Sequence, residues 1–202
     1  MDIRGSVHFH LHRCIQAMSQ CVSTAVALLL ARMKGVETGS GLVCRGVPYF
    51  YRTPHSVIEL GKDCSIYSSF KSNNIGSMSR SRICTQTPMA QINIGNNVGM
   101  SAVTITAHEQ INIGSDTLIG AGSVITDSDW HCLSANATER HTLPGKTAPI
   151  HIGKNVFIGT RCLILKGVTI GDGAIVGAGS VVTHDIPAGA KAAGNPCKII
   201  KQ

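Results

Sequence analysis

The sequence predicts an all-β solenoid, a parallel β-helix of hexapeptide repeats preceded by a short N-terminal α-helix, and three observations favour it. In this chain of 202 residues an aliphatic residue returns every six positions, at Ile152, Ile158, Ile164, Ile170, Val176 and Val182. Four positions after each comes a small or aliphatic residue, at Val156, Cys162, Val168, Ala174, Ser180 and Ile186. The composition, with 22 glycines and only 4% aromatic residues, suits a chain that turns often around a narrow interior. A period of six matches neither a helix nor a simple half-buried strand, so it indicates short strands joined by repeated turns.

Residues 1 to about 34 carry the helical pattern. Apolar residues recur there at three- and four-residue steps, and Gly35 is suited to end the helix. We expect a cap of residues 1–38 that covers the open edge of the first coil or packs on a neighbouring subunit. Contact with a membrane surface is the less favoured alternative. The longest apolar stretch, Cys21 to Ala31, is about 11 residues against the ~20 that a spanning helix needs, so we expect no membrane span.

Residues 39–187 are predicted to form the β-helix, followed by a tail of residues 188–202. The repeat is irregular from Gly39 to about Ala90 and becomes regular from Ile94. Equivalent isoleucines are 18 residues apart between Ile152 and Ile170, which predicts three hexapeptides, and hence three flat sides, in each coil. The interval from Ile94 to Ile113 is 19, which places one extra residue between 106 and 110.

The repeat is interrupted between Ile125 and Ile150. The insertion, about residues 127–149, holds the only tryptophan of the chain, two histidines and several charged residues. A polar insertion on a rigid repeat is a common place for a functional site.

Charge and cysteine content narrow the function. A net charge of +7 favours a polyanionic ligand such as a phosphorylated cofactor. Nucleic acid is a less favoured ligand, because the sequence has no basic cluster interleaved with aromatic residues. The eight cysteines form no CxxC pair, so we expect reduced thiols in a cytoplasmic protein, with Cys64 and Cys162 in the core.

The hexapeptides, the DSDWH segment at 127–131 and the closing AAGNPCKII together resemble the hexapeptide-repeat acyltransferases. Within that family the resemblance is to the sugar and polysaccharide O-acetyltransferases, which include maltose, galactoside, capsule and lipopolysaccharide acetyltransferases, and it covers about residues 55–202. It implies a left-handed β-helix, although parallel crossovers are usually right-handed. It further implies a homotrimer that binds acetyl-CoA between neighbouring subunits and acetylates a hydroxyl of a saccharide, such as a polysaccharide, lipopolysaccharide or capsule precursor.

Acetyl transfer from a thioester to a hydroxyl needs a general base, and histidine titrates near neutral pH. His131 is the candidate base, because it lies in the insertion where similar transferases place their catalytic histidine. Asp129, two residues earlier, could hold its tautomer if the segment is extended, and Asp127 is the alternative for that role. His141 and His151 are alternative bases, and His108 is expected to be structural.

The resemblance also implies the binding residues. The expected coenzyme A contacts are Thr160, Ala178, Thr183, His184, Lys198 and Lys201. The expected acceptor contacts are Asn73, Asn74, Trp130 and Arg140, because aromatic and amide groups suit sugar faces and hydroxyls.

Four alternatives stay open at this stage. The same base could serve N-acetylation of an amino sugar, and a Cys132 acyl intermediate is a less favoured route to the same products. A zinc enzyme like the γ-type carbonic anhydrases would need three histidines around the metal, commonly including an HxxxxH pair that this sequence lacks, so we expect no metal. A non-catalytic scaffold would bind no coenzyme A.

Overall fold

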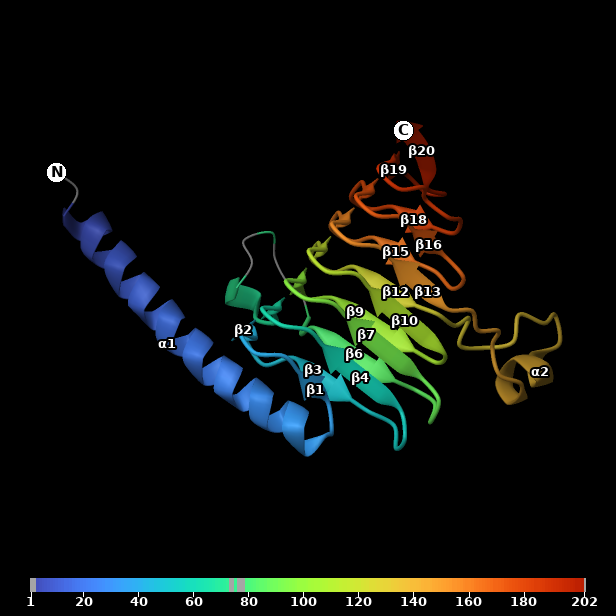
Figure 1. Ribbon diagram of the computed structural model, residues 1–202, viewed down its shortest axis with the longest axis horizontal. Coiled ribbons are helices and arrows are strands. Elements are labelled where there is room, and N and C mark those ends of the chain that lie inside the picture. The colour runs from blue at the N-terminus through green and yellow to red at the C-terminus, as the bar shows by residue number, and fades with distance from the viewer. Residues whose placement is uncertain (1–2, 73–74, 76–78, 202) are drawn as a thin grey trace.

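The computed structural model describes residues 3–72, 75 and 79–201. Its main body is a stack of coils, each contributing one strand to each of three sheets (Figure 1). All neighbouring strands within these sheets are parallel except the last pair of the second sheet. The predicted all-β, parallel, three-sided repeat is therefore confirmed.

The first sheet, sheet A, has six strands. They are β1 (Glu37–Thr38), β4 (Val57–Leu60), β7 (Gln91–Ile94), β10 (Gln110–Ile113), β13 (Ile150–Ile152) and β16 (Thr169–Ile170).

Sheet B has eight strands. They are β2 (Val43–Arg45), β5 (Ser65–Tyr67), β8 (Gly99–Ser101), β11 (Leu118–Ile119), β14 (Phe157–Ile158), β17 (Ile175–Val176), β19 (Lys191–Ala193) and β20 (Lys198–Lys201), the last two antiparallel.

Sheet C has six strands. They are β3 (Tyr49–Tyr51), β6 (Arg82–Thr85), β9 (Thr104–Ala107), β12 (Val124–Thr126), β15 (Leu163–Ile164) and β18 (Val181–Val182). A 3₁₀ turn, η1 (Phe70–Ser72), lies between β5 and β6.

The strand register explains why the period of six specifies this fold. Ile94 pairs with Ile113, and Ile152 pairs with Ile170, so the intervals read from the sequence are confirmed. Equivalent aliphatic side chains of successive coils therefore stack in columns inside the body, where they are buried. The expected inward positions of Cys64 and Cys162 are confirmed as well, because both are buried. Burial of each such aliphatic side chain stabilises the fold by roughly 1.5–3 kcal/mol.

The N-terminal helix is confirmed as α1 (Ile3–Met33), close to the predicted residues 1 to about 34. It has 31 residues, about 46 Å at 1.5 Å per residue, and it projects from the first coils (Figure 1). Gly35 follows it with φ +66°, and the Val36 amide donates to the Ala31 carbonyl, so the glycine ends the helix as expected.

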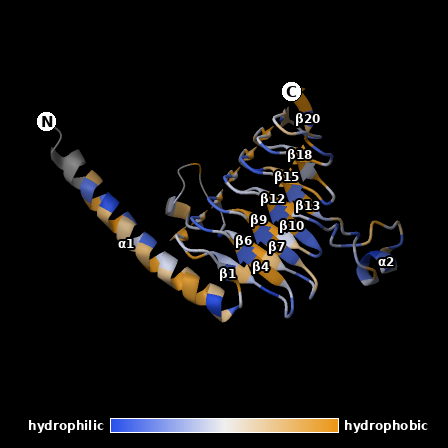
Figure 2. Ribbon diagram, in the orientation of Figure 1, coloured by the Kyte–Doolittle hydropathy of each residue, from blue (hydrophilic) through white to orange (hydrophobic). Residues whose placement is uncertain are grey.

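The expected length of the apolar stretch in this helix was wrong. Phe9–Met33 forms one continuous segment of 25 residues that is long and apolar enough to cross a membrane, by length and composition alone. Figure 2 shows that hydrophobic residues prevail in the C-terminal half of α1, where it lies beside the first coils.

Candidate active site

The insertion between β12 and β13 is an ordered ribbon. Ser128 bridges Thr147 and His131 bridges Pro144, both antiparallel, so the two ends of the insertion run side by side. At its outer end lies a second helix, α2 (Ala137–Thr142), which extends away from the coils (Figure 1). The paired ends hold the segment 128–131 against the body.

Asp127 fixes the root of this ribbon. Its side chain is 0% exposed, and its two carboxylate oxygens accept hydrogen bonds from the amides of His108 and Glu109, each at 2.7 Å. Those two amides belong to the extra residues of the preceding coil, where the 19-residue interval occurs. The carboxylate of Asp127 is therefore engaged with the backbone, and its alternative role as a partner of His131 stays a prediction.

Trp130 packs at the root of the ribbon. Its indole Nε1 donates to Thr126 Oγ1 at 3.2 Å, and its ring meets the His108 ring edge to face at 4.9 Å between centroids. Trp130 has φ +65°, a left-handed conformation that is unfavourable for a bulky residue. Gly145 packs against this turn, because a Cβ there would lie 2.8 Å from the amide nitrogens of Trp130 and His131.

His131 is the exposed histidine of this turn. Its amide donates to the Asp129 carbonyl at 2.7 Å, and among the described residues no hydrogen bond or ion pair of its ring is found. The carboxylate of Asp129 instead pairs with Lys166, with Oδ1 2.8 Å from Nζ. The suggested hold of Asp129 on the His131 ring stays a prediction, and no motif in the sequence singles out Lys166.

His108, expected to be structural, belongs to this group of side chains. Burial lowers the pKa of its imidazole, an effect that the nearby Asp127 carboxylate partly opposes. Its Nδ1 is buried, lies 3.9 Å from Asp127 Oδ1, and has no hydrogen-bond partner within the described part of the chain. The feature of the sequence that could have pointed to His108 is the one extra residue between 106 and 110.

The residues after the sheet C strands form a column beside the ribbon. The register of Ile125, Ile164 and Val182 makes Asp127, Lys166 and His184 equivalent positions in three successive coils. Thr183 Oγ1 and His184 Nδ1 are 2.8 Å apart and both residues are exposed. The structure thus brings two of the expected coenzyme A residues onto the same edge as Lys166.

Two further expected coenzyme A residues lie at the corner between sheets B and C. The Gly179 amide, next to Ala178, donates to the Thr160 carbonyl of the preceding coil at 2.8 Å. Gly159 permits this stacking, because a Cβ on it would lie 2.5 Å from the Ala178 nitrogen. Thr160 and Ala178 therefore lie next to each other in successive coils.

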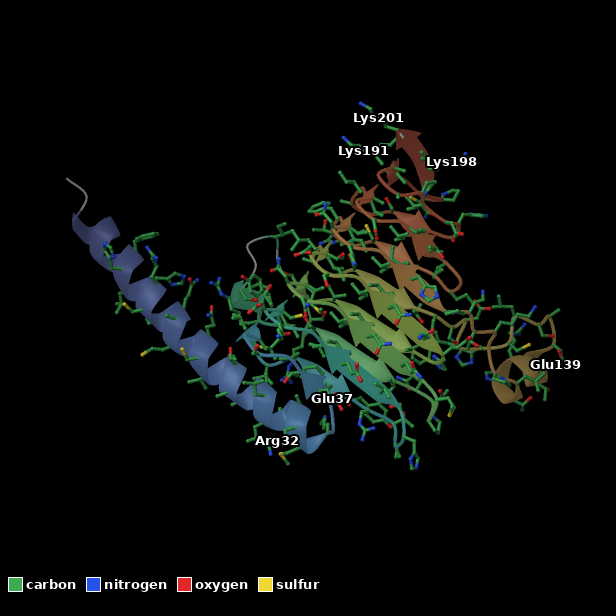
Figure 3. All side chains as sticks on the ribbon, in the orientation of Figure 1. Arg32, Glu37, Glu139, Lys191, Lys198 and Lys201 are labelled. Carbon is green, nitrogen blue, oxygen red and sulfur yellow. The ribbon has the colours of Figure 1, made fainter. Side chains whose placement is uncertain are left out.

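The remaining expected residues lie apart from the ribbon root. Lys198 and Lys201 are on the exposed strand β20 at the C-terminal tip, near Lys191 (Figure 3). Arg140 lies in α2 and donates through Nη1 to the carbonyls of Ser134 and Ala135, so it braces the tip of the insertion. The acceptor candidates Asn73 and Asn74 lie outside the described residues.

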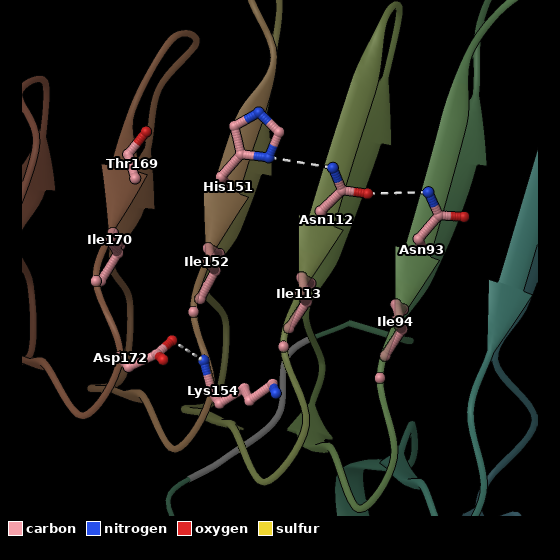
Figure 4. A pocket seen from close by; sticks show the side chains of 14 residues that line it. Asn93, Ile94, Asn112, Ile113, His151, Ile152, Lys154, Thr169, Ile170 and Asp172 are labelled. Carbon is pink, nitrogen blue, oxygen red and sulfur yellow. Dashed lines mark hydrogen bonds between the residues drawn. The ribbon is translucent and has the colours of Figure 1, made fainter. Parts of the chain in front are cut away.

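His151, an alternative base, lies on the outer face of sheet A. Its ring Nδ1 is 3.1 Å from the Asn112 amide, which is bonded in turn to Asn93 at 2.9 Å (Figure 4). These side chains line a shallow open hollow on successive strands. The other alternative, His141, is exposed on α2. Among the described residues, no group of three His, Cys, Asp or Glu side chains is arranged to hold a metal ion.

Comparison with known proteins identifies the repeat. Residues 149–184 match the family described as the hexapeptide repeat of succinyl-transferase. A protein of Staphylococcus aureus (strain COL) named as a putative acetyltransferase is 54% identical over 57 residues, 28% of this chain and 29% of the relative. The 2,3,4,5-tetrahydropyridine-2,6-dicarboxylate N-acetyltransferase of S. aureus (strain Newman) is 43% identical over 88 residues, 44% of this chain and 31% of the relative. The matches thus span about three-tenths of the length of these relatives.

Solved structures extend the likeness to the fold. A galactoside acetyltransferase in complex with coenzyme A aligns with a TM-score of 0.53 and 25% identity, over 82% of this chain and 64% of that one. An N-acyltransferase of Bacillus cereus, AntD, bound to dTDP-4-amino-4,6-dideoxyglucose and coenzyme A, aligns with a TM-score of 0.64 and 20% identity, over 85% of this chain and 86% of that one. The chain therefore carries the hexapeptide repeat of the acyltransferases and shares their fold, and the resemblance inferred from its motifs is confirmed.

Proposed function

We propose that this protein is an acetyl-CoA-dependent O-acetyltransferase that acts on a hydroxyl of a saccharide, such as a polysaccharide, lipopolysaccharide or capsule precursor. The observation that carries the proposal is the exposed His131, held on the paired ribbon beside the column of Lys166 and His184. The fold shared with a coenzyme A-bound galactoside acetyltransferase supports the donor.

In the proposed step, the His131 imidazole takes the proton of the acceptor hydroxyl as its oxygen attacks the thioester carbonyl. The tetrahedral intermediate collapses, the carbon–sulfur bond breaks, and the imidazolium returns the proton to the departing thiolate of coenzyme A. The products are an acetyl ester and free coenzyme A, so no covalent enzyme intermediate is needed. Lys166 holds the Asp129 carboxylate beside this histidine and limits the movement of the turn.

For the donor, we place the pantetheine arm along the backbone corner of Thr160 and Ala178 and beside Thr183 and His184. Gly159 lets the two coils stack closely at that corner, which gives a narrow chain close access to backbone amides. Lys198 and Lys201 would contact the phosphates, consistent with the net charge of +7.

Three wider features belong to the same proposal. We propose that the coil is left-handed, which the fold similarity to hexapeptide-repeat acyltransferases supports. We also propose a homotrimer whose neighbouring subunits complete the donor site, and a cytoplasmic location, which the eight free cysteines support.

The proposal is tested by release of free thiol from labelled acetyl-CoA over a panel of saccharide acceptors. Label transfer to a hydroxyl, lost in His131→Ala, is the expected result. Absence of transfer to every acceptor, together with no binding of acetyl-CoA, would favour a non-catalytic scaffold.

A second candidate is N-acetylation of an amino sugar. It is favoured by the 43% identical N-acetyltransferase segment, and the same base could serve it. Matched hydroxyl and amino forms of one sugar, compared by kcat/KM, separate the two candidates.

A further inference from the structure

Helix α1 packs on the body through its small and polar face. Arg45 Nε donates to Gln20 Oε1 at 2.9 Å, and the Cys44 amide donates to Thr24 Oγ1 at 2.9 Å. Ala27 and Ala31, on the same side of the helix, are buried. These contacts fix the C-terminal half of α1 against β2.

The opposite face of α1 is aliphatic and largely exposed, and only its residue Ile15 also borders a hollow between the described parts of the helix and the body. Its residues recur at steps that keep them on one side of a helix, and each is more than half exposed: Leu11, Ile15, Met18, Val22, Leu29 and Met33. We call these six residues the outer stripe. A helix that only capped the first coil would turn its aliphatic side inward, because exposure of such a stripe to water is unfavourable. The arrangement found here is the reverse, which indicates that the outer stripe has an apolar partner of its own.

The packing of α1 on β2 limits the orientation in which this helix could contact a membrane. Because Gln20 and Thr24 are bonded to β2, a bilayer crossed by α1 would have to be spanned by residues 3–19, which are about 25 Å long against the ~30 Å of a hydrocarbon core. This segment carries His10, His12 and Arg13 near its middle, and such groups are costly at the centre of a bilayer. The helix therefore suits a position in the plane of a membrane surface rather than across it.

The charge of the helix selects the kind of surface. From Ile3 to Met33 there is no acidic residue, whereas Arg4, Arg13 and Arg32 are cationic and Lys34 follows at once. Two copies packed side by side along the outer stripe would bring like charges together with no counter-charge. An anionic headgroup layer supplies that counter-charge.

We propose that α1 lies in the interface of an anionic lipid bilayer, with the outer stripe in the acyl region and the β-helix on the water side. This inference is independent of the proposed chemistry, since it uses no residue of the candidate active site.

The test is flotation of the full chain with vesicles of phosphatidylcholine and phosphatidylglycerol, compared with vesicles of phosphatidylcholine alone. Stronger binding to the anionic vesicles, weakened by salt, is the expected result. The double variant Ile15→Gln/Val22→Gln should lower the vesicle partition constant tenfold or more, because loss of each half-exposed aliphatic side chain should lower it about fivefold. Leu118→Gln/Phe157→Gln is the matched control, because these residues are similarly exposed on sheet B, and it should bind as the parent does.

Circular dichroism and thermal unfolding check that the variants keep the parent fold, and Arg13→Gln tests the electrostatic part separately. Failure of the parent to bind anionic vesicles overturns the inference. The inference is also overturned if Ile15→Gln/Val22→Gln dissociates an oligomer, as measured by light scattering without lipid, while its vesicle binding is unchanged. That result would assign the outer stripe to contact with a second copy of the chain. Resistance of the vesicle-bound chain to alkaline carbonate extraction would indicate a spanning helix instead.

Discussion

Replacement of Asp127 by asparagine tests whether this buried carboxylate fixes the root of the ribbon. The side chain is 0% exposed and accepts two backbone hydrogen bonds, from the amides of His108 and Glu109. Asparagine has nearly the same shape but offers one oxygen and one NH₂ group. One of the two amides would then face a donor instead of an acceptor.

The expected loss follows from these two bonds. A buried amide left without an acceptor costs about 1–3 kcal/mol, and the second bond loses its charge assistance, worth about 1 kcal/mol. The free energy of unfolding should therefore fall by about 2–4 kcal/mol at neutral pH. In a domain of this size that corresponds to a decrease in Tm of about 4–16 °C.

Denaturant unfolding at equilibrium measures this change. Asp185→Asn is the control, because the exposed Asp185 accepts a single bond, from the Thr169 amide at 2.7 Å, and its replacement should cost about 1 kcal/mol or less. A loss for Asp127→Asn no larger than that of the control would refute the assignment of Asp127 to the backbone. Unchanged stability combined with a large loss of turnover would assign this carboxylate to His131 instead.

Three further outcomes are expected. His131→Ala should lower kcat about 10²–10⁴-fold while the Kd of acetyl-CoA, measured by calorimetry, changes little; undiminished kcat would remove this histidine from the mechanism. Gly145→Ala should lower kcat tenfold or more, because its Cβ would displace the backbone of Trp130. Gly99→Ala should keep normal kinetics, because its Cβ would meet only side-chain atoms, the flexible end of Leu118 and the Ser65 hydroxyl. Burial lowers the pKa of His108 from its usual 6.5, so the unfolded chain binds more protons than the folded one, and unfolding free energy should fall as pH drops below about 6.5. His108→Gln should reduce that dependence in denaturant titrations across this pH range, and an identical slope in both proteins would contradict the effect.

The sequence by itself determined the coils. A buried strand position recurs each time the chain returns to the same side, so the spacing alone places Ile152 and Ile170 one above the other. The same periodicity located the insertion at 127–149 and, through the 19-residue interval, the bulge at His108. These features are local and repetitive, and a pattern in one dimension is enough to specify them.

Only the tertiary structure decided the contacts between coils. The ion pair of Asp129 and Lys166 joins residues that are 37 positions apart in the sequence. No spacing rule predicts which side chains meet where an insertion folds back. The same holds for α1, whose pattern predicted an amphipathic helix but gave no means to tell which face would pack. Because Gln20 and Thr24 find partners on β2, the polar side turns inward and the aliphatic stripe remains exposed. The hydrogen-bonding groups that the first coil offers to the helix therefore set its orientation.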